Sequence, residues 1–462
     1  MPLLRLIAEN VGPFERLEID FSDGKGKPNR GPHILAGVNG SGKSTVLRAI
    51  AWAMSWDRYG FPEEEWKHFL RGPGSRSFVH VAPDQGPAYL VGVSASADDG
   101  FFEKQQALAT SLGLGGLEDK GHQRSGPIWL RHGGSAAANH RPPMMCAYAP
   151  ARALAHLDTT AKMRPLSQST DDCLAFDAAV QNGALQDWWV GLFSRRALAK
   201  ERGEEFASYD QTISRFQAAL KLVCDDNEMR IDVELGRVLE PRVTLHKKRL
   251  NFSQLSDGIR TTIGWLADFM MRQDQIEATN GVEATRDGLL LLDEIDIYLH
   301  PRWQRTLLPA MRKALPEVQI IASSHSPFVI SSCRDARIHV LNLDAEGVAR
   351  AEAPQDAPFG ESVTATLKDI FGVESRFDVE TEGDLKEWDR LKREDAVGKL
   401  APSMQERLDA LSDELSERSE ELKLIVKSPR ALPASALDSL IGGRTRSPKR
   451  NGSRVPRNAK LG

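Results

Sequence analysis

The sequence predicts an α/β protein built around a mainly parallel sheet. Short apolar segments such as residues 288–292 have the length and composition of strands that are buried on both faces. Segments with the spacing of amphipathic helices alternate with these strands, which is typical of a sheet covered by helices. The composition, 41% hydrophobic and 27% charged, is that of a globular protein and excludes collagen-like, disordered and disulfide-scaffold classes.

The N-terminal residues predict two strands and then a strand–loop–helix unit. Residues 3–9 and 17–21 have the pattern of short strands. Residues 33–36 predict a buried strand that runs into a glycine-rich loop, and residues 45–56 follow with helical spacing.

A β-rich lobe is expected to be inserted over about residues 72–142. This segment is rich in glycine, serine and alanine, and residues 77–82 and 89–94 have the pattern of strands. Residues 111–138 are expected to form a loop because glycine and polar residues predominate there.

The middle of the chain predicts a strand, a helical lid and a pair of strands. Residues 144–148 have the pattern of a buried strand, and residues 176–224 predict the lid. Residues 229–234 and 242–246 alternate like paired strands, and residues 256–273 predict a helix.

Further strands and one helix complete the predicted α/β core. Residues 288–292, 319–323 and 337–341 have the pattern of strands. Residues 301–314 predict a single amphipathic helix between the first two of these strands.

The C-terminal part differs in composition from the rest. Residues 377–428 predict a charge-rich helical segment with leucines along one face, and residues 429–462 are expected to be a disordered basic tail. No acidic residue lies between Arg444 and Lys460, and Pro448 and Pro456 disfavour a helix there. A solvated tail is the simpler interpretation, and contact with nucleic acid or a protein partner is the alternative.

The charge and cysteine content add little that is specific. The net charge of −4 does not indicate a nucleic-acid binder, but it does not exclude a basic face on one part of the surface. The four cysteines are widely separated, so we expect buried small hydrophobic residues rather than disulfides or zinc ligands. No signal-peptide core or membrane-length apolar run is present, so we expect a cytoplasmic protein without a membrane partner.

The strongest motif is GVNGSGKST at residues 37–45. It matches G-x-x-x-x-G-K-[ST] and lies between a predicted strand and a predicted helix, the context that a phosphate-binding loop requires. Glycines let main-chain N–H groups approach phosphate oxygens, and the start of a helix favours the same anion. Lys43 would contact the β- and γ-phosphates, and the Ser44 hydroxyl would ligate Mg²⁺. The predicted nucleotide-binding residues are Gly37, Asn39, Gly40, Ser41, Gly42, Lys43, Ser44 and Thr45.

Two carboxylates follow the apolar strand at residues 288–292. Asp293 can hold Mg²⁺ through water, and Glu294 can act as the general base for an attacking water. His325 follows the strand at residues 319–323. If that strand lies beside the Asp293 strand, His325 faces the γ-phosphate as a sensor.

A weaker motif, LSDG, begins the helix predicted at residue 256. The free N–H groups of this helix and the Ser256 hydroxyl would form a second anion site, which would also include Asp257 and Gly258. Helix capping alone is the alternative interpretation of this motif.

In chain order the four motifs are the glycine-rich loop, the LSDG segment, the Asp293–Glu294 pair and His325. Together they resemble the ATP-binding-cassette (ABC) ATPase head of transporter ATPases, SMC-like proteins, RecF and the overcoming-lysogenization-defect nucleases. The resemblance implies a P-loop ATPase head over residues 1–376 that uses ATP and Mg²⁺ and works as a homodimer or higher oligomer. It implies that Glu294 and His325 are catalytic, and that the Ser256–Asp257–Gly258 signature contacts the γ-phosphate bound by the partner subunit.

The sequence departs from this pattern at two places. The usual signature is LSGGQ, and this chain has Asp257 and Ile259 at the two differing positions, with Arg260 next as a substitute polar contact. The usual Q-loop glutamine has no clear equivalent, and the corresponding region CAYAPAR offers Tyr148 and Arg152 instead.

Within this superfamily the chain resembles the small ATPases of bacterial defence islands, namely the PtuA ATPases of the Septu antiphage system and their retron-linked relatives. The resemblance is carried by NVGPF, LSDGIR, LHPRWQ, SSHSPF and TLKDIFGVESR. The interval between Lys43 and Ser256 is too long for a transporter ATPase and lacks the sustained heptads of an SMC protein.

In Septu systems a separate HNH protein, PtuB, is the cutting subunit, so the resemblance implies a regulatory ATPase with an HNH nuclease partner. Intrinsic nuclease activity is not expected, because no D-x-D pair or H-N-H cluster follows the head. The alternative is a RecF- or SMC-like DNA-repair ATPase that binds DNA.

Overall fold

The computed structural model divides the chain into two compact units, Met1–Thr366 and Leu367–Gly462. It describes residues 2–55, 67–82, 88–96, 100–114, 117–120, 128–132, 144–150, 173–174, 176, 182–235, 239–280, 288–373 and 377–427. The predicted basic tail, residues 429–462, and Arg152 lie outside the described residues.

A mixed sheet with a parallel core forms the centre of the first unit. Among the described residues its strand order is β15-β14-β3-β13-β12-β8, and β16 also pairs with β14. The five strands from β14 to β8 are parallel to one another, which confirms the predicted fold class. The strands are β3 (His33–Gly37), β8 (Met144–Tyr148), β12 (Gly288–Leu292), β13 (Val318–Ser323), β14 (Arg337–Leu343), β15 (Ala349–Ala351) and β16 (Gln355–Asp356).

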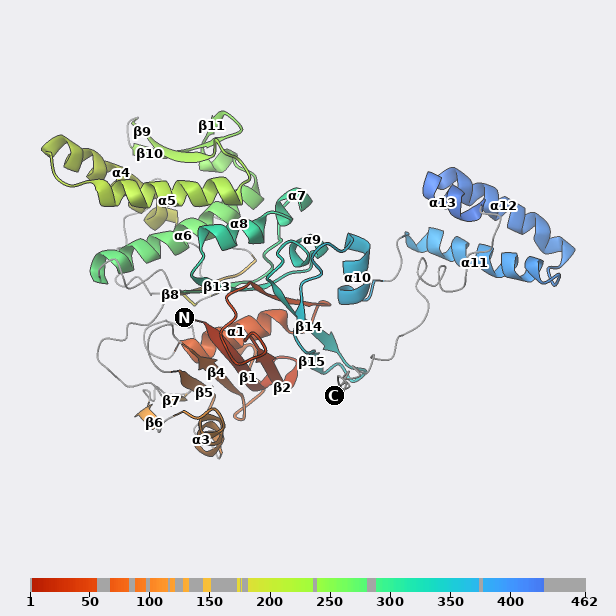
Figure 1. The fold of residues 1–462 in the computed structure, drawn as a ribbon, viewed down its shortest axis with the longest axis horizontal. Helices are drawn as coiled ribbons and strands as arrows, with labels where there is room; N and C mark the ends of the chain where they lie inside the picture. Colours follow the sequence, from red (N-terminus) through yellow and green to blue (C-terminus); the bar gives the residue numbers. More distant parts are fainter. Residues whose placement is uncertain are drawn as a thin grey trace, which may run out of the picture. The chain divides into compact units, whose positions relative to one another are not determined.

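Four of these strands are buried along their whole length, namely β3, β8, β12 and β13. Their apolar runs are what parallel strands covered on both faces require. Figure 1 shows α1 (Lys43–Met54) on one side of the parallel strands and α6 (Asp257–Asn280) with α8 (Leu307–Ala314) on the other. Because β3, β13 and β12 are neighbouring parallel strands, their carboxyl ends meet at one edge of the sheet.

A second, antiparallel sheet contains the N-terminal strands together with strands from the predicted lobe. Its order is β2-β1-β4-β5-β7-β6, and α1 packs against strands of both sheets. Its members are β1 (Leu3–Val11), β2 (Phe14–Asp20), β4 (Arg76–Val81), β5 (Tyr89–Ser94), β6 (Leu117–Lys120) and β7 (Ile128–His132), with α3 (Phe101–Ser111) following β5.

The expectation of a loop over residues 111–138 is therefore wrong in part. Both β6 and β7 fall in this segment and add to the edge of an existing sheet. Main-chain pairing with a neighbouring strand stabilises such short strands, and the composition of the segment does not reveal that neighbour.

Helices α4 (Asn182–Arg202) and α5 (Ala207–Val223) lie in the segment predicted as a helical lid. Aromatic rings join them: Trp189 on α4 lies 4.9 Å from Phe216 on α5, measured between ring centroids. The chain continues into a small antiparallel sheet of β9 (Arg230–Leu235), β10 (Leu239–Leu245) and β11 (Lys248–Leu250), and then a 3₁₀ turn, η1 (Phe252–Gln254), leads to α6.

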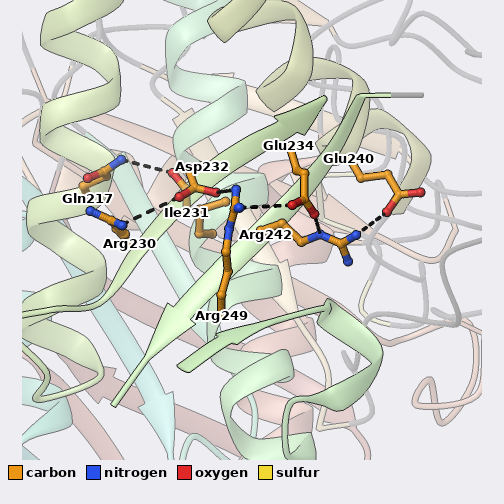
Figure 2. A network of polar contacts seen from close by, with 8 residues as sticks. All are labelled: Gln217, Arg230, Ile231, Asp232, Glu234, Glu240, Arg242 and Arg249. Atoms are coloured by element: carbon orange, nitrogen blue, oxygen red, sulfur yellow. Dashed lines mark hydrogen bonds and ion pairs between the residues drawn. The ribbon is translucent and has the colours of Figure 1, made fainter. Parts of the chain in front are cut away.

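Charged side chains connect the three strands of this small sheet. Arg249 on β11 reaches Asp232 at 2.7 Å and Glu234 at 3.1 Å, and Arg242 on β10 bonds to Glu234 and Glu240 (Figure 2). Exposed ion pairs are weak one by one, and they contribute more when several share partners, as here. This network therefore helps to fix the register of the sheet.

The single helix predicted at residues 301–314 is instead two helices, α7 (Pro301–Gln304) and α8. Pro309 supplies the physical reason: it has no N–H, and its ring would clash with the carbonyl of Arg305 in a continuous helix. Two further helices, α9 (Pro327–Ile330) and α10 (Val363–Phe371), complete this part of the chain.

The second unit contains α11 (Val379–Ala396), α12 (Pro402–Arg418) and α13 (Glu420–Val426). The leucine face predicted here is buried in a core made of Leu385, Trp388, Leu391, Leu408, Leu411, Leu415, Leu422 and Val426. The Trp388 indole Nε1–H donates to the Ser412 hydroxyl at 3.0 Å, which links α11 to α12.

Two whole-chain expectations concern cysteines and membranes. All four cysteines are buried, as predicted for small hydrophobic residues, and none forms a disulfide. None of the described helices is long and apolar enough to cross a membrane.

Candidate nucleotide-binding site

The glycine-rich loop joins β3 to α1, and Lys43 is the first residue of that helix. Gly37 has a φ of 145°, and a Cβ there would lie 2.1 Å from the Leu341 carbonyl oxygen. Gly42 has a φ of 92°, and a Cβ there would lie 2.4 Å from the Phe14 ring. Glycine is therefore required at both positions by backbone conformation and by close packing.

The NVGPF segment packs against this loop, which gives a structural reason for its place in the resemblance. Pro13 and Phe14 approach Gly42, and a Cβ on Gly12 would lie 2.7 Å from the Thr45 side chain. The turn between β1 and β2 thus supports the loop from the antiparallel sheet.

Ser41 in the loop and Lys43 at the start of α1 are buried, while Asn39 and Gly40 are exposed. The Lys43 ammonium donates to the carbonyl oxygens of Gly37 at 3.0 Å and Val38 at 2.9 Å. The Ser41 hydroxyl is buried and has no hydrogen-bond partner among the described residues. An unpaired buried hydroxyl is costly, and a phosphate oxygen would satisfy it.

Asp293 and Glu294 follow β12 and are held by the last residue of the neighbouring strand β13. The Ser323 hydroxyl donates to Asp293 Oδ1 at 2.6 Å and accepts from the Glu294 main-chain N–H at 2.7 Å. On the other side of β12, the Asp293 N–H donates to the Tyr148 carbonyl oxygen at 2.9 Å. Asp293 is buried, and Glu294 is partly exposed.

His325 lies two residues beyond β13, beside the carboxylate loop. Its main-chain N–H donates to Asp296 Oδ1 at 3.4 Å. Burial lowers the pKa of His325, and the Lys43 ammonium acts in the same direction, against the nearby carboxylates. Burial also lowers the pKa of Lys43, which the Asp293 and Glu294 carboxylates oppose. The structure therefore brings Lys43, Asp293, Glu294 and His325 into one electrostatic neighbourhood.

The LSDG segment lies at the N-terminus of α6. Ser256 and Asp257 are exposed, and Gly258 is buried against the loop after β12, where a Cβ would lie 2.3 Å from the Tyr298 carbonyl oxygen. The Arg260 guanidinium bonds to the Asp257 carboxylate of the same chain. The contact of this segment with a second subunit stays a prediction.

A buried polar network connects α6 to the edge strand β8. The Tyr148 hydroxyl donates to Asp268 Oδ2 at 2.7 Å, and Arg272 Nε donates to the same oxygen at 2.8 Å. Arg272 Nη1 also reaches Cys173 Sγ at 3.0 Å. Burial raises the pKa of Tyr148 well above its ordinary value, and the Asp268 charge adds to this, so the phenol stays a donor.

Sequence reasoning missed two residues that organise this site, Ser323 and Gln304. Ser323 carried one signal, since it is a polar residue directly after the apolar run Ile320–Ala322 of β13. The side chain of Gln304, on α7, contacts both the loop after Asp293 and the segment after His325. Gln304 ends the LHPRWQ segment of the resemblance, but nothing in that segment assigns it a role.

Two family models match separate parts of the chain. The family model "AAA domain, putative AbiEii toxin, Type IV TA system" matches residues 181–331, which include the signature segment, Asp293, Glu294 and His325. A second "AAA domain" model matches residues 5–106, which include the glycine-rich loop.

Two curated relatives are similar to the chain over different lengths. The Septu protein PtuA of Bacillus thuringiensis is 21% identical over 79% of this chain and 83% of its own length. The retron Vc95 probable ATPase of Vibrio cholerae is 28% identical over 28% of this chain, an alignment that spans only a quarter of that relative. Among solved structures, the SMC head domain from Thermotoga maritima is 15% identical, with a TM-score of 0.39, over 76% of this chain and 99% of that domain.

Proposed function

We propose that this chain, an ATPase of the AAA and ABC type related to the Septu and retron ATPases, binds ATP with Mg²⁺ and hydrolyses it. One observation carries the proposal. The glycine-rich loop, the Asp293–Glu294 pair and His325 extend from the carboxyl ends of the neighbouring strands β3, β12 and β13. Ligand sites of α/β sheets form at such ends.

The residues present fit a nucleotide and its magnesium ion. The unpaired Ser41 hydroxyl, the Lys43 ammonium and the loop N–H groups are donors suited to phosphate oxygens. The Ser44 hydroxyl and the Asp293 carboxylate are hard oxygen ligands of the kind that Mg²⁺ prefers. Mg²⁺, when bound there, supplies charge neutralisation for the β- and γ-phosphates.

In hydrolysis, Glu294 is the proposed general base. Its carboxylate takes a proton from the water whose oxygen bonds to the γ-phosphorus, as the bond to the β–γ bridging oxygen breaks and ADP leaves. Burial lowers the pKa of His325, which favours the neutral ring. A neutral ring can donate a hydrogen bond to the γ-phosphate and assist in placing it.

Replacing Glu294 with Gln tests this assignment. The amide keeps the shape and cannot accept the proton, so we expect phosphate release to fall at least about 100-fold, within the range that general-base catalysis contributes. Binding of ATP, measured by calorimetry, should stay within about threefold. A wild-type chain that binds ATP and turns over no faster than Glu294→Gln would show a nucleotide-binding scaffold instead of an enzyme.

We also propose that Ser256, Asp257 and Gly258 act on the nucleotide of a second copy of the chain. The exposure of Ser256 and Asp257 at the start of a long helix supports this. Ser256→Arg should abolish hydrolysis and leave ATP binding to the isolated chain intact. Wild-type hydrolysis by this variant would exclude the two-subunit site.

The biological role we propose is regulation of a partner HNH nuclease in antiphage defence, in the cytoplasm. The similarity to a Septu protein over most of both chains supports this role. Co-purification with the product of an adjacent gene, followed by nuclease assays across ATP concentrations, tests it. Failure of the two proteins to associate, with or without ATP, would contradict the partner proposal and leave the ATPase proposal standing.

A further inference from the structure

The acidic loop, residues 293–300, follows a strained path after β12. Glu294 has a φ of 46° and Tyr298 a φ of 61°, both in the left-handed region that residues with a Cβ rarely adopt. Such conformations persist where surrounding contacts over-determine them. The contacts that hold the acidic loop therefore decide where the Glu294 carboxylate lies.

Gln304, the last residue of α7, holds the far end of this loop. Its Nε2 donates to the carbonyl oxygens of Leu299 at 2.9 Å and Asp296 at 3.3 Å. Carbonyl oxygens can only accept, so the amide nitrogen must face the loop and the amide oxygen must face a donor. The donor is the Ser326 hydroxyl, 2.7 Å from Gln304 Oε1.

Ser326 belongs to a second segment, the histidine loop, residues 323–326. Its hydroxyl also accepts from the N–H groups of Phe328 and Val329 at the start of α9, so its position is fixed from both sides. At the near end, Ser323 joins this loop to Asp293 and Glu294. Ser323 and Gln304 thus join the acidic and histidine loops, in addition to the bond from the His325 N–H to Asp296 described above.

We infer that Gln304 is a positioning residue that fixes Glu294 and His325 relative to one another through Leu299 and Ser326. The inference rests on the hydrolysis proposed above. Both N–H groups of the amide are engaged by loop carbonyls, so Gln304 acts through the loops and does not donate to the nucleotide.

Gln304→Met tests this, because methionine has the same length and shape without the hydrogen bonds. We expect kcat for ATP to fall about 10- to 100-fold, the loss typical of misplacing a catalytic group by about 1 Å, with KM unchanged within about threefold. The matched control is Gln405→Met, at an exposed glutamine on α12 whose amide contacts Asp409. Full activity in Gln304→Met would overturn the inference.

A double-mutant cycle separates positioning from general stability. In a His325→Ala background, Gln304→Met should cost less than about threefold in kcat, because one of the groups that it positions is already missing. If the loss in kcat is equally large in both backgrounds, Gln304 does not act through His325 and the inference is wrong.

Amide hydrogen exchange gives a readout that needs no turnover. Gln304→Met should speed exchange at least about tenfold in peptides covering residues 293–300 and 323–326, and Gln405→Met should leave both peptides unchanged. If the wild-type chain releases no phosphate, the proposed function fails, and loop exchange still decides the role of Gln304. Unchanged protection of both loops would refute that role.

Discussion

Two buried histidines, His33 and His339, lie on the neighbouring strands β3 and β14. Their rings are hydrogen-bonded, with His33 Nδ1 and His339 Nε2 3.0 Å apart, and His33 Nε2 lies 3.3 Å from the Asn29 carbonyl oxygen. The carbonyl can only accept, so the neutral His33 ring carries its proton on Nε2 and accepts from His339 through Nδ1. Adding a proton to His33 would break this arrangement.

This pair predicts that acid destabilises the fold. Burial lowers the pKa of His33 to about 4 and that of His339 well below its ordinary value. Between about pH 6.5 and pH 4 the unfolded chain therefore binds protons that the folded chain does not, and stability falls with falling pH. The expected slope is up to about 1.4 kcal/mol per pH unit for each histidine.

The measurement is urea unfolding of the wild type and of His339→Gln between pH 5 and pH 6.5, above the range of ordinary carboxylates. The slope of the unfolding free energy against pH should be smaller in the variant. His68→Gln, at an exposed histidine, is the control and should keep the wild-type slope. Equal slopes in all three proteins would contradict the prediction.

At the scale of elements, α6 joins the signature segment to the sheet through the Tyr148–Asp268 contact described above. Tyr148→Phe removes the hydroxyl and leaves the ring in place. We expect it to lower the free energy of unfolding by about 1–3 kcal/mol, because the buried Asp268 Oδ2 loses one of its two donors and keeps only Arg272. Asp268→Ala should cost more, about 3–5 kcal/mol, because it leaves the buried Arg272 without its carboxylate.

Unfolding in urea checks both variants, with Tyr298→Phe at an exposed tyrosine as the matched control. A loss for Tyr148→Phe no larger than that for Tyr298→Phe would mean that the network does not stabilise the attachment of α6 to β8.

The elements also show which parts of the fold the sequence could predict. Strands β8 and β12 are continuous apolar runs, and β13 is apolar apart from Gln319 and Ser323; burial on both faces produces that signal directly. The order of the strands, with β3 between β13 and β14, depends on contacts between distant segments and has no local signature. The break between α7 and α8, just ahead of Pro309, could have been predicted from proline chemistry. Strands β6 and β7, in contrast, depend on a neighbouring strand.

In the candidate site, too, local sequence signals predicted some residues and contacts between distant segments determine others. The sequence predicted its candidate residues, because the G-x-x-x-x-G-K-[ST] spacing lies between a predicted strand and a predicted helix, and the Asp293–Glu294 pair directly follows an apolar strand. The residues that hold them, Ser323 and Gln304, act by hydrogen bonds across the sheet edge. A serine and a glutamine occur at so many surface positions that only the folded geometry identifies them.

At the scale of the whole molecule, the two units have separate cores. Within the described residues, the buried core of the second unit comes from α11, α12 and α13, with Trp388 as its largest side chain. All the residues of the proposed nucleotide site belong to the first unit. A ligand that binds only the folded state stabilises the unit that holds its site, so nucleotide should act on one unit and leave the other unchanged.

We therefore expect two unfolding transitions, of which Mg²⁺-ATP moves one. In calorimetry of the Glu294→Gln chain, which should not consume the ligand, ATP at 100 times its dissociation constant should stabilise the first unit by about 2.7 kcal/mol. Trp388→Ala should cost the second unit about 3–5 kcal/mol and move only the other transition. A single transition that shifts with both ATP and Trp388→Ala would show instead that the two units unfold cooperatively, because only coupled units would respond together to changes confined to one of them.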